Sequence, residues 1–284
     1  MRTVTKLMKN WQFTGPDGKV TAVDLPHTWN NIDGQDGGND YWRGTCLYQT
    51  SFAKPEYDAD SQQVWLQFEG VNASAAVTLN GTEVICHDGG YSTFRADVTA
   101  LLADENTLTV AVDNSKNDRV YPQKADFTFY GGIYRDVSLL VVNKNHIALN
   151  YLGSCGVRIT PTVKGSSADI RVQTRVEGEG EVEITICDAA GSTVLNGSGT
   201  DTTLTMQHPR LWDGVRDPYL YTCVVRLMKD GQPVDEVRQR FGVRSFRVDP
   251  KQGFFLNGRA YPLHGVSRHQ DRKGLGNAIT REMH

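Results

Sequence analysis

The polar side chains that could do chemistry are densest near the end of the chain. Residues 264–271 contain two histidines, an arginine and an aspartate, namely His264, Arg268, His269 and Asp271. Imidazole and carboxylate groups are the usual proton donors and acceptors in enzyme active sites. The sequence contains no Ser-His-Asp arrangement, phosphate-binding loop or His-Glu-x-x-His zinc motif that would indicate a complete alternative chemistry. These residues therefore need partners from elsewhere.

This polar segment follows a β-type run and precedes what reads as the start of a helix. The run contains an Asn-Gly turn at residues 257–258. Thr280 has the position of a helix N-cap, and Glu282 falls in the first turn, where the helix dipole favours a carboxylate. A strand, a polar loop and a helix make one βα unit, whose polar residues would point into the mouth of a barrel. One such unit cannot bury its own faces, so we expect the chain to be part of a larger protein.

Three further segments hold polar groups that a packed core would not select. Residues 26–30 and the Gly/Asp-rich stretch 34–42 have aromatic ends, which suits a sugar-facing loop and equally any surface loop. Asn72 lies directly before a strand, where asparagine either binds a ligand or closes a turn. Asp126 has aromatic neighbours on both sides. Its carboxylate could accept sugar hydroxyl groups, help to hold a cation, or simply end a strand.

The elements that must position these residues are almost all strands. Apolar alternation or short apolar runs, bounded by Gly, Asn, Asp and Pro, predict strands at residues 47–53, 64–69, 75–79, 107–113, 136–142, 170–176, 182–187 and 221–228. The pairs Asn80-Gly81 and Asp230-Gly231 predict two-residue hairpin turns. The fold class that follows is all-β.

Two sandwiches fit this pattern better than one. A jelly-roll β-sandwich of about 140 residues would end near residue 143, and an immunoglobulin-like β-sandwich of about 100 residues would follow a polar link. We therefore expect domains over residues 1–143 and 144–244, with residues 245–284 opening a third. The second sandwich holds no unusual polar constellation, so a spacer role is predicted for it.

Composition excludes several classes of partner. The net charge is −3 over 284 residues, and Lys and Arg are scattered, so neither nucleic acid nor an anionic membrane is an expected partner. No apolar run reaches the roughly 18 residues of a membrane span, and no signal peptide is seen, which predicts a cytoplasmic location unless an export signal is missing.

Free thiols rather than disulfides or a zinc site are expected for the five cysteines, Cys46, Cys86, Cys155, Cys187 and Cys223.

Four ordered motifs resemble glycoside hydrolase family 2. They are Phe68-Glu69-Gly70-Val71-Asn72-Ala73 with Leu79-Asn80-Gly81, then Gly89-Gly90-Tyr91-Ser92-Thr93-Phe94, then Gly131-Gly132-Ile133-Tyr134-Arg135-Asp136-Val137, and finally His264-Gly265-Val266-Ser267-Arg268-His269-Gln270-Asp271. The similarity runs over essentially the whole chain. The β-galactosidases look closest, because of residues 26–30 and Asp126, and the β-glucuronidases and β-mannosidases are relatives.

The resemblance implies a role for each domain. Residues 1–143 would be a jelly-roll sugar-binding domain, and residues 245–284 the start of a truncated TIM-barrel catalytic domain. Asn72 and Asp126 would reach toward the terminal galactose, with Asp126 beside a monovalent cation. His269 would stabilise the transition state, and Arg268 would support its loop.

The resemblance also implies what this chain lacks. Retaining glycosidases use two carboxyl groups about 5 Å apart, one as acid and base and one as nucleophile. The family supplies both as glutamates from later barrel strands, so none of the 284 residues is expected to be a catalytic carboxylate. The magnesium ligands of the galactosidases would also lie beyond residue 284. The parent enzyme is expected to use Mg and Na and to be a homo-oligomer, and the chain alone is predicted to show no hydrolysis.

Two other classes of function remain open from the sequence. A β-glucuronidase of the same family is one alternative on the enzyme side. A free-standing carbohydrate-binding module would explain the jelly roll and its aromatic loops, but the incomplete βα unit opposes it. A purely structural double sandwich would leave residues 264–271 without a purpose. The expected partners are therefore a β-galactoside and the chain's own missing TIM barrel.

Overall fold

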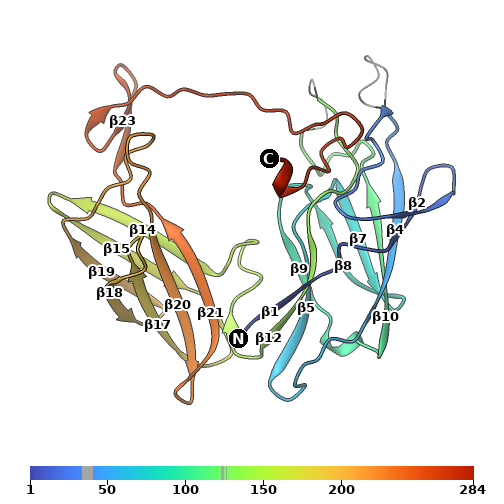
Figure 1. The fold of residues 1–284 in the computed structure, drawn as a ribbon, viewed down its shortest axis with the longest axis horizontal. Helices are drawn as coiled ribbons and strands as arrows, with labels where there is room; N and C mark the ends of the chain where they lie inside the picture. The colour runs from blue at the N-terminus through green and yellow to red at the C-terminus, as the bar shows by residue number, and fades with distance from the viewer. Residues whose placement is uncertain (34–40, 123–124, 126) are drawn as a thin grey trace. The chain divides into compact units, whose positions relative to one another are not determined.

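The structure is a computed structural model that describes residues 1–33, 41–122, 125 and 127–284. The described residues form two compact units (Figure 1). The jelly-roll unit comprises residues 3–142 and 268–284, and the immunoglobulin-like unit comprises residues 1–2 and 143–267. The chain therefore contributes a short terminal piece to each unit in addition to its main segment.

The jelly-roll unit is built from two antiparallel sheets. The four-stranded sheet has the order β1-β12-β5-β9, and the six-stranded sheet has the order β3-β2-β4-β10-β7-β8. The strands of this unit are β1 Thr3–Lys6, β2 Trp11–Thr14, β3 Val20–Val23, β4 Thr45–Ala53, β5 Gln62–Phe68, β6 Val71–Asn72, β7 Ser74–Leu79, β8 Thr82–Asp88, β9 Phe94–Asp97, β10 Glu105–Asp113, β11 Gly132–Ile133 and β12 Val137–Asn143. A 3₁₀ turn, η2 (Thr99–Leu101), precedes β10.

Strict alternation along the central strands directs one face of each sheet into the core. In β4, every second residue from Cys46 to Phe52 is buried, and the residues between them are exposed. Trp11, Tyr48 and Phe68 are among the largest fully buried side chains. Burial of one such side chain contributes about 1.5–3 kcal/mol. This core fixes the sheet that carries the loops described below.

The immunoglobulin-like unit pairs a three-stranded sheet, β14-β15-β19, with a four-stranded sheet, β18-β17-β20-β21. Its buried core includes Ile170, Ile184 and Val225. The strands of this unit are β13 His146–Ile147, β14 Val157–Lys164, β15 Ser167–Thr174, β16 Val176–Glu177, β17 Glu181–Cys187, β18 Thr193–Ser198, β19 Asp201–Gln207, β20 Tyr221–Lys229, β21 Gln232–Phe241, β22 Phe246–Asp249, β23 Gly253–Leu256 and β24 Arg259–Ala260. The predicted all-β class with two sandwiches is confirmed.

The predicted two-residue turns are present. Asn80 and Gly81 join β7 to β8 with φ angles of 52° and 81°, and Asp230 and Gly231 join β20 to β21 with φ angles of 50° and 73°. Positive φ at both central residues is the hairpin geometry that matches the twist of the flanking strands. Asn-Gly at residues 257–258 joins β23 to β24 in the same way.

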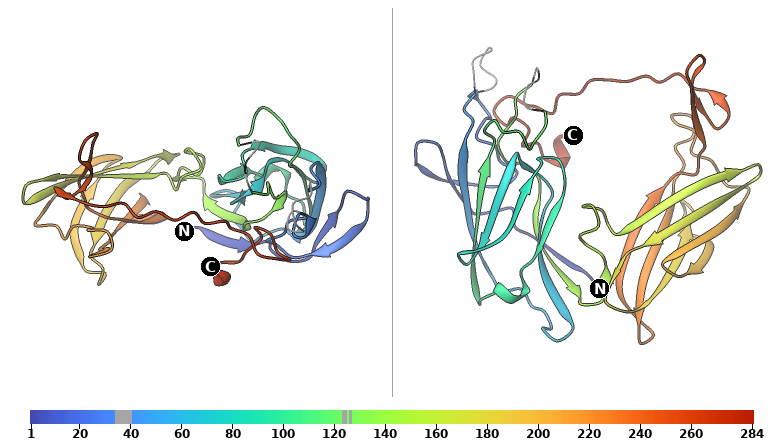
Figure 2. Two further views of the ribbon diagram at one scale, coloured as in Figure 1. Left: turned by 90° about the horizontal axis from the view of Figure 1, so that it is seen from above. Right: turned by 180° about the vertical axis from the view of Figure 1, so that it is seen from behind.

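The βα unit predicted near the C-terminus does not form as expected. β23 pairs antiparallel with β22 and β24, and residues 261–270 have no regular secondary structure. Arg281–Met283 is a single 3₁₀ turn, and the side chain of Thr280 makes no capping hydrogen bond. A barrel strand needs parallel neighbours on both sides, and the described residues supply none to β23. Residues 268–284 instead pack in the jelly-roll unit (Figures 1 and 2).

All five cysteines lie among the described residues and are free thiols, as expected. Cys46 and Cys223 are buried, and burial raises the pKa of each thiol to about 12. Within the described part of the chain, we find no helix of the length and apolar character needed to cross a membrane.

Candidate functional site

Two of the sequence-predicted site residues, Asn72 and His269, lie against one segment of the jelly-roll unit, residues 127–133. β11 (Gly132–Ile133) pairs with β6 (Val71–Asn72), with Gly132 opposite Asn72. This pairing brings Asn72 beside the segment that follows Asp126. Asp126 itself lies outside the described residues, so its predicted contacts with a sugar or a cation stay predictions.

Asn72 is buried and uses its amide within the protein. Its Nδ2 donates a hydrogen bond of 2.7 Å to the carbonyl oxygen of Tyr130. On its other side it lies against Gly90, where an added Cβ would come within 2.3 Å of the Asn72 Oδ1. Asn72 therefore links two loops at this end of the sandwich, and its predicted contact with a sugar remains untested.

The Pro26-His27-Thr28-Trp29-Asn30 motif also turns inward. The Thr28 hydroxyl donates to the Gly131 carbonyl oxygen at 2.6 Å, and the Asn30 Oδ1 accepts from the Gly131 N–H at 2.8 Å. Gly131 is required for this close approach, because a Cβ there would lie within 2.0 Å of the Trp29 ring. The motif thus holds Gly131, the residue next to the Tyr130 carbonyl that Asn72 binds.

The C-terminal segment docks against the same loops. His269 lies edge-on to Phe127, with ring centroids 6.3 Å apart and an interplanar angle of 78°. Asn31 donates through its Nδ2 to the carbonyl oxygen of Gly274 at 3.0 Å. Gly276 packs so closely on the Tyr130 ring that a Cβ there would come within 2.7 Å of it. Residues from both ends of the sequence therefore share one site.

Arg268 and His269 are both exposed on this segment. A side-chain nitrogen of Arg268 contacts the Nδ1 of His284. The structure places His269 beside Phe127, in the segment that follows Asp126. Their roles in stabilising a transition state and supporting its loop are not tested by this contact.

Burial shifts the pKa values of two side chains in the jelly-roll unit, His27 and Tyr134. His27 packs 4.8 Å from the Phe13 ring, and its Nδ1 lies 2.7 Å from the Tyr48 hydroxyl. Burial disfavours the charged imidazole and lowers the pKa of His27 to about 4. The pKa of Tyr134 is raised to about 12, again because burial disfavours the charged form. Both groups are therefore neutral at pH 7 and act as hydrogen-bonding groups.

A pocket of about 500 Å³ lies between the jelly roll and the terminal 3₁₀ turn η3 (Arg281–Met283). Charged groups of both signs line it, among them Lys6, Glu69, Asp136 and Glu282. The Lys6 Nζ and an Asp136 carboxylate oxygen are 2.7 Å apart. This hydrogen bond raises the pKa of Lys6. Asp136 therefore forms its ion pair with Lys6.

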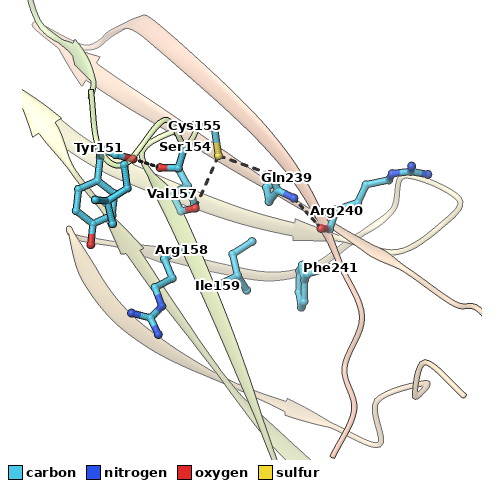
Figure 3. A pocket seen from close by; sticks show the side chains of 10 residues that line it. Tyr151, Ser154, Cys155, Val157, Arg158, Ile159, Gln239, Arg240 and Phe241 are labelled. Carbon is cyan, nitrogen blue, oxygen red and sulfur yellow. Dashed lines mark hydrogen bonds between the residues drawn. The ribbon is translucent and has the colours of Figure 1, made fainter. Parts of the chain in front are cut away.

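The immunoglobulin-like unit has a separate groove of about 640 Å³ at the edge of its sandwich. The edge strands β14 (Val157–Lys164) and β21 (Gln232–Phe241) form its walls, and the Cys155 thiol lies 3.6 Å from Gln239 Oε1. Figure 3 shows the guanidinium groups of Arg158 and Arg240 pointing away from this contact. None of the site residues predicted from the sequence lines this groove.

No group of three or more His, Cys, Asp or Glu residues could hold a metal ion in the described part of the chain.

The sequence analysis did not identify one residue that contacts the candidate site, Asn114. Asn114 follows β10 and donates to the Phe129 carbonyl oxygen at 3.0 Å. The only sequence feature that could have indicated Asn114 is its place directly after a buried strand, and many ordinary turns share this feature.

Two family models match the chain. Residues 7–143 match the sugar-binding domain of glycosyl hydrolases family 2, and residues 153–244 match a second domain of glycosyl hydrolases family 2. The chain is 36% identical over 300 residues to a β-glucuronidase of Bacteroides fragilis, in an alignment covering 98% of this chain and 43% of that protein. It is 29% identical to a β-galactosidase of Bacteroides ovatus, covering 95% of this chain and 35% of that protein.

Solved structures agree with these matches. The crystal structure of an FMN-binding β-glucuronidase from Faecalibacterium prausnitzii L2-6 superposes with a TM-score of 0.95 at 38% identity, covering 99% of this chain and 45% of that one. The chain thus spans less than half the length of these relatives. Both matched domains, in the order in which the motifs occur, establish that the chain belongs to glycoside hydrolase family 2.

Proposed function

We propose that this chain supplies the sugar-binding scaffold and one rim of the substrate pocket of a retaining glycosidase. The observation that carries the proposal is the approach of His269 to Phe127 at the loop end of the jelly roll. This contact joins the polar C-terminal segment to the sugar-binding domain. Catalytic carboxylates from a following barrel would complete the pocket.

The division of labour follows from the chemistry of glycoside hydrolysis. Two carboxyl groups about 5 Å apart would perform acid catalysis and nucleophilic attack. His269 would donate a hydrogen bond that strengthens as the transition state forms, and Arg268 would support its loop. Asp126 and Asn72 would complete the wall of the pocket that faces the terminal sugar. None of these groups can replace the two carboxylates, so the chain alone is expected to be inactive.

The terminal sugar is proposed to be a β-glucuronide, with a β-galactoside as the second candidate. The sequence motifs at residues 26–30 and Asp126 favoured a galactoside. Relatives of both names reach similar identity, since a β-glucuronidase and a putative β-galactosidase of known structure are each 38% identical to this chain. The name β-glucuronidase is the more frequent one among the similar proteins, and this frequency supports the glucuronide first.

Several properties of the full-length protein remain proposals. Its partner would be the TIM barrel that follows these residues, and it would form a homo-oligomer in the cytoplasm. Magnesium held by the barrel and sodium beside Asp126 would be its metal ions. The location depends on the lack of a visible signal peptide and the other proposals on the family resemblance, and all are separate from the sugar assignment.

Turnover and binding measurements test the proposed function. The purified chain should not release nitrophenol from 4-nitrophenyl β-D-glucuronide or β-D-galactoside, whereas a full-length protein that contains it should hydrolyse one of them with retention. Calorimetric titration of the chain with glucuronate and galactose should show no tight binding. Tight binding by the chain alone would instead favour a carbohydrate-binding module, and robust turnover by it would overturn the proposal.

A further inference from the structure

Three buried asparagines of the jelly-roll unit form hydrogen bonds to the backbone of three consecutive residues, 129–131. Asn114 Nδ2 donates to the Phe129 carbonyl oxygen at 3.0 Å, and Asn72 Nδ2 donates to the Tyr130 carbonyl oxygen at 2.7 Å. Asn30 Oδ1 accepts from the Gly131 N–H at 2.8 Å. We name Asn30, Asn72 and Asn114 the amide frame.

The members of the amide frame are connected and shielded from water. Asn114 Nδ2 also donates to Asn30 Oδ1 at 3.1 Å, so two members bond directly. Asn30 and Asn114 are 0% exposed, and Asn72 is 4% exposed. A buried amide left without a partner costs about 1–3 kcal/mol. The frame therefore holds residues 129–131 in one conformation, because any displacement would leave several buried groups unpaired.

The segment held by the amide frame presents an aromatic ring to the candidate site. Phe127 lies two residues before Phe129, whose carbonyl oxygen the amide frame binds. The ring centroids of Phe127 and Phe129 are 5.0 Å apart. Its other neighbour is His269, whose ring is edge-on at 6.3 Å. Phe127 is 40% exposed, so within the described residues its restraint comes chiefly from Phe129 and His269.

We propose that Asn30, Asn72 and Asn114 are positioning residues, whose hydrogen bonds to residues 129–131 fix the Phe127 ring against His269. In this role they act through Phe127 and need no contact with a reacting group. The significance of this arrangement for a sugar pocket rests on the proposed function, but the positioning itself does not. In a preorganised site, neighbouring side chains must hold an imidazole within a fraction of an ångström of its working position.

The other end of β10 (Glu105–Asp113) provides a matched control. Asn106 is 1% exposed, and its Nδ2 donates to the Ala103 carbonyl oxygen at 2.8 Å while its Oδ1 accepts from the Ala103 N–H at 2.9 Å. It lies eight residues before Asn114, which is about 26 Å along a strand. Substituting Asn106 should therefore destabilise the same sandwich without reaching His269.

The experiment is an NMR measurement of the His269 ring in the 284-residue chain. His269→Gln assigns its resonance, and Phe127→Leu gives the value without the aromatic neighbour. We expect Asn114→Ala to move the His269 resonance toward the Phe127→Leu value, and Asn106→Ala to leave it in place. Asn72→Ala, which removes one bond from the frame, should move it in the same direction and serves if Asn114→Ala does not fold.

The proposal is overturned if folded Asn114→Ala or Asn72→Ala keeps the wild-type His269 resonance. It is equally overturned if Asn106→Ala moves that resonance as far, because the effect would then report general loosening of the sandwich. No step of this test needs hydrolysis or sugar binding. Failure of the proposed function would therefore leave the NMR result interpretable.

Discussion

Arg2 and Asp235 form a bidentate ion pair within the immunoglobulin-like unit. Arg2 Nε and Nη2 donate to the two carboxylate oxygens of Asp235 at 2.7 and 2.8 Å. The Ile147 N–H also donates to Asp235 at 2.7 Å, and Arg2 Nη2 donates to the Ile147 carbonyl oxygen. The second residue of the chain is thus bonded to a unit whose main segment begins at residue 143.

Removing the carboxylate of Asp235 should strongly destabilise the immunoglobulin-like unit. The side chain is 0% exposed, so Asp235→Ala would leave the Arg2 guanidinium and the Ile147 N–H without their partner. We expect a loss of about 3–5 kcal/mol in the free energy of unfolding of this unit, measured by denaturant titration. Asp201→Ala is the control, because Asp201 forms an equally two-pronged pair with Arg171 at the surface. Comparable losses in both variants would contradict the prediction.

Stability of the jelly-roll unit should fall when His27 is protonated. Its pKa is about 4 in the folded protein, against an ordinary value of 6.5, so the unfolded chain binds more protons between these values. The contribution of His27 is therefore complete above pH 6.5 and is lost as the pH falls toward 4, by about 3 kcal/mol. Urea unfolding at pH 7 and pH 4.5 measures this loss.

A histidine variant separates His27 from the carboxylates that titrate in the same range. His27→Gln should flatten the pH dependence of unfolding of the jelly-roll unit, since it removes the titrating group. His208→Asn, at an exposed histidine, should retain the wild-type profile. Parallel pH profiles for the wild type and His27→Gln would show that His27 does not carry the effect.

Alanine at the second turn residue should weaken both hairpins through backbone strain alone. Gly81 and Gly231 have φ angles of 81° and 73°, and a Cβ at either position would meet no atom within 4 Å. We expect Gly81→Ala and Gly231→Ala each to cost about 1–2 kcal/mol, measured by thermal or chemical unfolding. Gly15→Ala should have a much smaller effect, because Gly15 lacks a positive φ and its nearest contact is an ordinary 3.4 Å. Equal effects at Gly15 would argue against backbone strain as the cause.

The isolated chain should associate through the exposed apolar side chains of β22 (Phe246–Asp249). Phe246 and Val248 are 65% and 73% exposed there, and Leu263 is 70% exposed nearby in the sequence. Large exposed apolar groups that lie together favour association. Light scattering should show a mass that rises with concentration, and the double variant Phe246→Ser, Val248→Ser should lower it. Val20→Ser, at a 59% exposed residue of the jelly-roll unit, should not. A monodisperse wild-type monomer would refute this prediction.

Local patterns in the sequence were sufficient to predict most of the strands. Alternation at residues 47–53 predicted β4 (Thr45–Ala53) to within two residues, and Asn80-Gly81 predicted the turn after β7. β1 (Thr3–Lys6) was missed, because all four of its residues are exposed and it lies at a sheet edge. An edge strand without a buried face leaves no alternating signal.

The candidate site was only partly predictable, because its bonds join residues that are distant in the sequence. The motifs identified His269 and Asn72, but nothing local indicates that Asn114 bonds to Asn30, 84 residues away. The expected helix after Thr280 is a single 3₁₀ turn, because starting a helix fixes several residues for one hydrogen bond and is therefore unfavourable in a short segment. Tertiary pairing therefore decides both the polar contacts of the site and the shape of the C-terminal segment.

The antiparallel pairing of β1 (Thr3–Lys6) with β12 (Val137–Asn143) has a consequence for synthesis on the ribosome. Lys6 pairs with Ser138, so the first strand must wait for about 130 further residues before its partner exists. At typical elongation rates this delay is roughly 7 to 26 s. During that interval β1 is an unpaired strand, available to chaperones and proteases until β12 emerges.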